Sequence, residues 1–160
     1  MTSTLRTIGY EGATLDGFLA ALRRARVSLL IDVRAVAVSR RKGFSKTALA
    51  AALREAGIGY LHLRDLGDPK PGREAARAGR MAEFRTIYTA HLRGAVAQAA
   101  LAEAARVAQQ RAVCLLCYEG EPSGCHRAIV AASIARKTGL VVQHLHPDAP
   151  RVSGKPAAAA

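Results

Sequence analysis

One apolar segment, residues 27–33 with the sequence VSLLIDV, constrains the fold more than any other part of the chain. It is almost continuously apolar, and it is closed by Asp32 and Arg34. A strand with one solvated face alternates apolar and polar residues, whereas a strand buried on both faces is apolar along its length and is typical of parallel sheets. The segment therefore favours a parallel sheet covered by helices.

Further strand-like segments alternate with helical patterns along the chain. After Thr14, a residue type that caps helices, apolar residues from Leu15 to Leu22 recur at helical spacing. Strands that alternate with helices imply right-handed crossovers. We therefore predict a three-layer α/β fold with a mostly parallel five-stranded sheet and helices on both faces. The other expected strands are residues 5–10, 58–63, 112–118 and 140–145, and the other expected helices are residues 46–56, 81–110 with a break near Gly94, and 126–138.

The chain length of 160 residues suits one domain, which we place at residues 1–146. Residues 147–160 have no core-forming pattern and are expected to form a flexible tail. Residues 64–80 combine prolines, glycines and charges, which predicts an exposed loop that becomes helical towards its end. Because no apolar run approaches the roughly 20 residues of a membrane helix and no signal-peptide core is present, we expect a cytoplasmic protein without membrane contact.

The chain carries 24 Lys and Arg against 12 Asp and Glu, a net charge of +12. Such a surplus attracts polyanions, so nucleic acid or another phosphate-bearing ligand is the first expected partner. The segment SRRKGFSK combines four cations and two hydroxyls with one aromatic ring. We expect Ser39, Arg40, Lys42 and Lys46 to contact phosphate and a base to stack on Phe44. The alternative is an ordinary solvated basic loop with Phe44 in the core.

Polar residues follow the end of every expected strand. Ligands of parallel α/β sheets bind beyond the carboxyl ends of the strands, which meet at one edge. One such residue alone has ordinary explanations in capping or packing. Together they predict a functional cleft, because burying several charges is costly unless partners or a substrate offset it. The residues are Tyr10 and Glu11, Asp32 and Arg34, His62 and Arg64, Cys117, Tyr118 and Glu119, and His144 and His146.

The segment from Cys117 to Arg127 has the highest density of reactive side chains, and it passes from a strand through a loop into a helix. The amino end of that helix and Arg127 would favour an anion. The same environment would favour the thiolate of Cys117 or Cys125, so either could act as a nucleophile, or both could simply fill the interior. We expect reduced thiols in a chain without secretory features.

The cysteines also raise the question of a metal. Cys117, Cys125 and His126 could bind zinc or iron with His144 or His146, but their spacing matches no standard zinc finger. We therefore predict no metal and no cofactor, and we assign Cys125 and His126 to substrate binding.

Several motifs resemble one known family. They are TIGYEG at residues 7–12, LIDVR at 30–34, SRRKGFSK at 39–46, and LLCYEGEP at 115–122 followed by CHR at 125–127. In order and spacing the chain is similar, over about residues 5–146, to the proteins of the domain of unknown function 488 family. The resemblance implies an α/β fold and a site at these motifs, without an established activity. Members usually carry a proline between DVR and SR, where this chain has residues AVAV, and its loss would loosen the loop before Ser39.

Three functions are consistent with these residues. The first is an enzyme that hydrolyses a phosphoester or N-glycosidic bond in nucleic acid or a nucleotide-like substrate. Asp32 and Glu119 would be its general base or electrostatic stabiliser, as suits an oxocarbenium-like transition state. Tyr10 completes that catalytic group, and Arg34, Arg40 and Arg127 would hold phosphate. Glu11 and His62 are further expected substrate ligands.

The second is a thiol- or metal-dependent enzyme, for sulfur transfer or redox chemistry, that uses Cys117 and Cys125. The third is a nucleic-acid-binding protein without catalytic activity.

Overall fold

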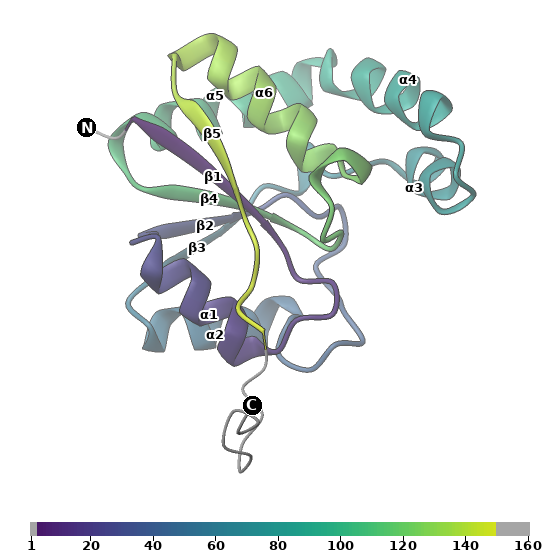
Figure 1. The fold of residues 1–160 in the computed structure, drawn as a ribbon. Helices are drawn as coiled ribbons and strands as arrows, with labels where there is room; N and C mark the ends of the chain where they lie inside the picture. Colours follow the sequence, from purple (N-terminus) through teal and green to yellow (C-terminus); the bar gives the residue numbers. More distant parts are fainter. Residues whose placement is uncertain (1–2, 150–160) are drawn as a thin grey trace, which may run out of the picture.

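The computed structural model describes residues 3–149, which form a five-stranded sheet in the order β3-β2-β4-β1-β5 (Figure 1). All neighbouring strands are parallel, so the prediction of a mostly parallel sheet is confirmed. The strands are β1 (Thr4–Gly9), β2 (Leu29–Asp32), β3 (Gly59–His62), β4 (Val113–Cys117) and β5 (Val141–Leu145).

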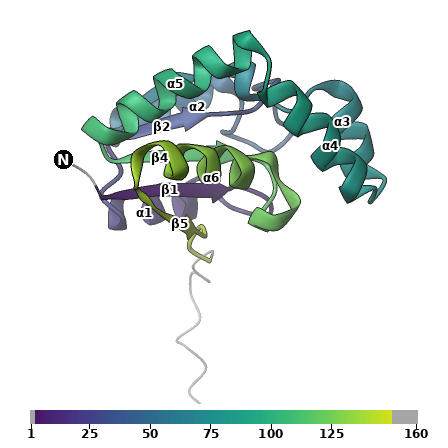
Figure 2. The ribbon, with the colours of Figure 1, turned by 90° about the horizontal axis from the view of Figure 1, so that it is seen from above.

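Helices cover both faces of the sheet, as the alternating pattern predicts. On one face lie α1 (Leu15–Arg24) and α2 (Lys46–Glu55); on the other lie α5 (Ala95–Gln110) and α6 (His126–Thr138) (Figures 1 and 2). Two shorter helices, α3 (Lys70–Arg77) and α4 (Met81–Leu92), pack on each other and extend past the carboxyl ends of the strands (Figure 2). The expected long helix 81–110 is thus two helices, α4 and α5, separated at Gly94 as predicted.

Two apolar cores fill the spaces on either side of the sheet. Two of the three inner strands, β2 and β4, are buried along their whole length, which is why their sequences are apolar except for Asp32 at the end of β2. Alternate residues face opposite cores: Leu30 and Leu116 pack towards α1 and α2, whereas Ile31 and Cys117 pack towards α5 and α6. Cys117 therefore points to the face on which α6 begins.

A buried ion pair fastens the end of β2. Asp32 has no solvent exposure, and Arg34 is 6% exposed. The Arg34 Nε and Nη2 atoms donate to the two Asp32 carboxylate oxygens at 2.9 and 2.7 Å. Arg34 Nη1 also donates to the Tyr10 hydroxyl at 3.1 Å and to the Phe44 carbonyl at 2.7 Å, and the Tyr60 hydroxyl donates to Asp32 at 2.6 Å. The pair thus connects β2 with the end of β1, with β3 and with the loop before α2.

The segment 64–80 becomes helical towards its end as α3, as predicted, but it is not exposed throughout. It also forms a 3-10 turn (Arg64–Leu66) and buries Leu66 and Asp68. Near the end of the described residues, Asp148 pairs with Arg24 of α1, and the domain boundary at residue 146 stays a prediction. Residues 150–160 of the expected tail lie outside the described residues. Within residues 3–149 no helix is long and apolar enough to cross a membrane.

The ion pair of Asp32 and Arg34 yields a test of the fold. Asp32→Ala leaves a buried guanidinium without its carboxylate, so the free energy of unfolding in urea should fall by roughly 3–5 kcal/mol. The control is Arg24→Met, which removes the exposed pair with Asp148 and should leave the unfolding midpoint close to that of the wild type. Equal losses in the two variants would contradict a stabilising role for the buried pair.

Candidate active site

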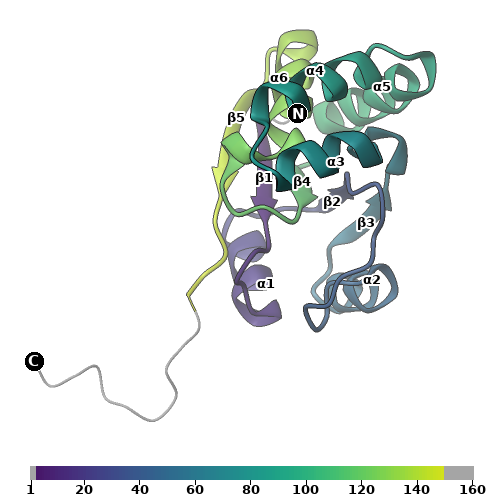
Figure 3. The same ribbon diagram turned by 90° about the vertical axis from the view of Figure 1, so that its right-hand side faces the viewer.

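In the strand order, β4 lies between two strands whose following helices cover the opposite face of the sheet from its own. After β1 and β2, the two neighbours of β4, the chain turns to α1 and α2 on one face; after β4 it turns to α6 on the other (Figure 3). In open α/β sheets this divergence leaves a crevice at the carboxyl ends of the strands, where ligands bind. The last residue of β4, Cys117, lies at this point.

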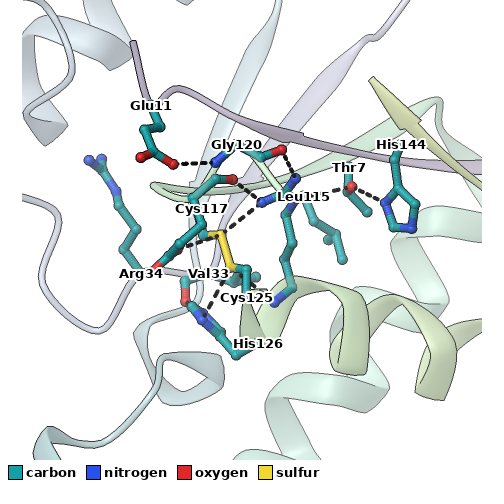
Figure 4. Close-up of a disulfide and its surroundings, with 12 residues drawn as sticks. Thr7, Glu11, Val33, Arg34, Leu115, Cys117, Gly120, Cys125, His126 and His144 are labelled. Carbon is teal, nitrogen blue, oxygen red and sulfur yellow. Dashed lines mark hydrogen bonds between the residues drawn. A yellow bond between two sulfur atoms is a disulfide. The ribbon is translucent and has the colours of Figure 1, made fainter. Parts of the chain in front are cut away.

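Two cysteines meet there. Cys117 at the end of β4 and Cys125, the residue that caps α6, are joined by a disulfide, and their exposed fractions are 1% and 3% (Figure 4). The expectation of reduced thiols is wrong for this pair, because the loop 118–124 returns the chain to the end of β4 before α6 begins. Cys114 is unpaired, and burial raises the pKa of its thiol.

Arg127 is a fully buried cation beside this disulfide. Its Nη1 atom donates to Cys117 Sγ at 3.2 Å and to the Glu119 carbonyl, and its Nε donates to Thr7 Oγ1 at 3.1 Å. Among the described residues no carboxylate forms an ion pair with Arg127. Burial is the largest influence on its guanidinium and lowers its pKa.

Gly9 makes this arrangement possible. A Cβ atom at residue 9 would lie 1.8 Å from the Glu119 carbonyl oxygen and 3.0 Å from Arg127 Nη1. Only a residue without a side chain allows the loop after β4 and the guanidinium to approach β1 this closely. The close approach of the loop therefore explains the first glycine of the TIGYEG motif.

Glu119 places a carboxylate next to the disulfide. Its Oε2 atom lies 3.3 Å from Cys117 Sγ, and burial, the largest influence, raises its pKa. A carboxylate in this place can accept a proton from the Cys117 thiol when the pair is reduced. Glu11, an expected substrate ligand, instead accepts a hydrogen bond from the Gly120 backbone at 3.0 Å and holds the same loop.

The His126 ring is buried next to Cys125. Its Nε2 atom lies 2.7 Å from the Val33 carbonyl oxygen, which can only accept, so Nε2 carries the proton. Its Nδ1 lies 3.6 Å from Cys125 Sγ. Burial, the largest influence, lowers the pKa of His126 to about 4, so the ring is neutral near pH 7.

The cluster contains possible metal ligands. Cys117 Sγ, Cys125 Sγ and one His126 ring nitrogen all lie within 4.8 Å of one another. His144 and His146, weighed above as the completing ligands, are not in this group among the described residues. The His144 Nδ1 atom instead lies 2.6 Å from Thr7 Oγ1.

Asp68 is a buried carboxyl group that the sequence analysis missed. It is 5% exposed, and among the described residues its Oδ1 atom has no hydrogen-bond partner. Burial is the largest influence on its pKa and raises it to about 7; Arg73 opposes this rise and Glu119 adds to it. Its position shortly after β3, near the carboxyl edge of the sheet, could have indicated it. The charged, proline- and glycine-containing segment DLGDPKPG around it instead predicted exposure.

The remaining catalytic candidates, Asp32 and Tyr10, occupy the buried network around Arg34. Both Asp32 oxygens are bound by Arg34, and one also by Tyr60, so the carboxylate is saturated and does not suit a general base. Arg34 makes four side-chain hydrogen bonds within the fold and is paired with Asp32, so it does not suit a phosphate ligand. The predicted stacking of a base on Phe44 is wrong, because its ring is fully buried and stacks on Tyr10 at 4.5 Å.

The other expected ligands follow the ends of β2 and β3. His62 Nε2 lies 2.7 Å from the Arg34 carbonyl oxygen, and the Ser39 hydroxyl accepts from the Arg41 backbone at 3.0 Å. Arg40, Lys42 and Lys46 are exposed in and after the loop that follows β2. The structure thus groups Cys117, Glu119, Cys125, His126 and Arg127, and leaves the basic loop as a separate surface.

These features define a parallel α/β protein with a buried cysteine pair at the point where its strand order reverses. The model of one family, described as Domain of unknown function DUF488, matches residues 14–134, and the chain belongs to this family. The searches of curated proteins and of solved structures gave no match.

Asp68 yields a prediction for pH dependence. Its pKa of about 7 lies above the ordinary value, so the folded state keeps a proton that the unfolded state loses, and stability falls as pH rises from about 4 to about 7. Asp68→Asn removes this loss and should be more stable than the wild type at about pH 8, by roughly 2 kcal/mol, with no advantage below about pH 4.

The measurement is urea unfolding across this pH range. Asp65→Asn, an exposed change three residues earlier, is the control and should follow the wild-type profile. If Asp68→Asn also follows that profile, the pKa of Asp68 is not raised.

Proposed function

We propose that the protein is a thiol-dependent redox enzyme whose Cys117 and Cys125 cycle between dithiol and disulfide. The observation that carries the proposal is the buried Arg127 guanidinium, which contacts Cys117 Sγ at 3.2 Å and has no carboxylate partner among the described residues. An arginine remains charged in a protein interior, and an unpaired buried charge costs several kcal/mol. A Cys117 thiolate would supply the missing negative charge.

The surroundings of both sulfurs support the same chemistry. Glu119 lies 3.3 Å from Cys117 Sγ and is placed to accept the thiol proton. Cys125 Sγ accepts from the Arg127 backbone N–H at 3.5 Å, at the amino end of α6. Cationic groups and helix amino ends both stabilise thiolates, so each cysteine has a feature that favours its reactive form.

The reaction balances with a disulfide as oxidant. The Cys117 thiolate attacks one sulfur of a small-molecule disulfide, forms a mixed disulfide and releases one thiolate. The Cys125 thiolate then attacks Cys117 Sγ, which forms the Cys117–Cys125 bond and releases the second thiolate. Two electrons pass from the protein to the substrate, and a second thiol compound must return them. A small substrate fits best, because both sulfurs are almost fully buried.

Hydrolysis of nucleic acid, the first function expected from the sequence, stays a prediction with less support. Its proposed general base Asp32 is saturated by Arg34 and Tyr60, and Phe44 is buried. Glu119, the other carboxylate of that hypothesis, contacts Cys117 and fits the role of proton acceptor in thiol chemistry.

Trapping of the mixed disulfide tests the redox proposal. The reduced Cys125→Ser variant should react with a small aromatic disulfide and retain one half of it on Cys117, as measured by intact mass. The wild type should instead return to the intramolecular disulfide and release both halves, and Cys117→Ser should form no adduct.

Cys114→Ala is the matched control, since Cys114 is buried in the same strand but lies outside the pair, and it should behave as the wild type. If the native pair resists reduction and Cys125→Ser gains no adduct until the chain is unfolded, the disulfide is structural and the proposal fails.

A second candidate activity, binding of a nucleic acid or another polyanion, is favoured by the basic loop after β2. Arg40, Arg41 and Lys42 are exposed, and so are the apolar side chains of Val36 and Val38, at 57% and 73%. Cations beside exposed apolar groups suit a ligand that offers phosphates together with bases. This surface lies at the same edge of the sheet as the cysteine pair.

Replacing Arg40 and Lys42 together by Ala should weaken binding to a single-stranded oligonucleotide at low salt and lower the slope of log K against log salt by about 1.4. Fluorescence anisotropy at several salt concentrations measures both quantities. The control replaces Arg136 and Lys137, at the far end of α6, and removes the same charge. An equal effect of both double variants would show that the net charge alone attracts the ligand.

A further inference from the structure

We propose that the reduced Cys117 and Cys125, together with His126, form a binding site for a borderline-soft divalent cation of the Zn²⁺ type. The proposal does not rest on the redox function, although it uses the same two cysteines. Its first basis is convergence: two sulfurs and one ring nitrogen lie within 4.8 Å of one another, and all three residues are buried.

The orientation of His126 is the second basis. Its Nε2–H donates to the Val33 carbonyl at 2.7 Å, which leaves the Nδ1 lone pair facing Cys125 Sγ at 3.6 Å. Histidine ligands of metals typically donate the other ring N–H to a backbone carbonyl or a carboxylate in this way. A disulfide alone needs no imidazole beside it, so the oriented ring indicates a further ligand.

The sulfur atoms have the hydrogen bonds expected around metal-bound thiolates. The Arg127 side chain contacts Cys117 Sγ at 3.2 Å, and the Arg127 backbone N–H contacts Cys125 Sγ at 3.5 Å. Two thiolates and a neutral imidazole would form a complex without net charge with a divalent ion, and a neutral group is far less costly to bury than a charged one. Thiolate and imidazole ligands select Zn²⁺ over Mg²⁺ or Ca²⁺.

The backbone spacing leaves space for an ion once the sulfur bond is opened. The Cα atoms of Cys117 and Cys125 are 7.4 Å apart. Most disulfides have Cα separations of about 4.4–6.8 Å. Three protein ligands with the fourth position left to water or substrate are the arrangement of catalytic zinc sites. Only the dithiol can bind the ion, so metal and disulfide exclude each other.

Metal titration of the full chain tests this site. The protein is reduced, freed of metal and titrated anaerobically with Co²⁺ as the spectroscopic probe. We expect one equivalent to bind with thiolate-to-cobalt absorption in the near ultraviolet, and Zn²⁺ but not Mg²⁺ to displace it. Cys117→Ser and Cys125→Ser should lose this absorption, His126→Gln should bind at least about tenfold more weakly, and Cys114→Ala should match the wild type.

A second measurement does not depend on any variant. Zn²⁺ should protect two thiols of the reduced wild type from alkylation, whereas the oxidised protein should bind no Co²⁺. Absence of one-equivalent binding by the reduced wild type, or an unchanged spectrum in Cys117→Ser, would overturn the metal site. Mixed-disulfide trapping in Cys125→Ser requires no metal, so failure of the metal site and failure of the redox proposal are told apart.

Discussion

The architecture of the site depends on the burial of one guanidinium. Arg127 lies in the first turn of α6 and reaches Thr7 on β1, Cys117 on β4 and the carbonyls of the loop that joins β4 to α6. These contacts fix the start of the helix against the ends of two neighbouring strands. They also require Gly9, since any side chain there would occupy the position of the loop backbone. The residue that fixes the start of α6, Arg127, is therefore also the residue that contacts the sulfur of Cys117.

A second buried arginine shows what is unusual about the first. Arg34 is matched by the Asp32 carboxylate, which occupies two of its nitrogens, and by the Tyr10 hydroxyl and a carbonyl on the third. Its charge is neutralised within the fold, so it does not suit an anionic ligand. Arg127 has only neutral acceptors and a sulfur atom among the described residues. Both arginines are buried beside the ends of β-strands, but only Arg34 has a carboxylate partner, which is why we propose a functional role for Arg127 and a structural one for Arg34.

This distinction also explains how far the sequence could predict the site. The apolar run at β2 and the alternation of elements were sufficient for the parallel sheet. The polar residues after each strand lie at the carboxyl edge of the sheet because all strands are parallel, and their roles stay predictions. Which of those residues are saturated depends on side-chain pairing, which spacing does not determine, so Asp32 and Cys117 looked equally suitable. Asp68 was missed because proline, glycine and charge indicate exposure, whereas the packing of α3 buries it. The pairing of Cys117 with Cys125 depends on the path of a loop.

The charge around Arg127 links the two states proposed for the cysteines. In the disulfide state the sulfurs are neutral, and among the described residues the guanidinium has no ion pair, although the charges of Glu119 and Glu121 act on it. Reduction creates thiolates next to it, so the reduced state gains an electrostatic stabilisation that the oxidised state lacks. Stabilisation of the reduced form makes a disulfide a stronger oxidant. A divalent ion would neutralise the same thiolates and weaken their pull on Arg127. If the cysteines react as proposed, oxidation and metal binding are therefore alternatives, because each uses the same thiolates and removes their negative charge from the side of Arg127.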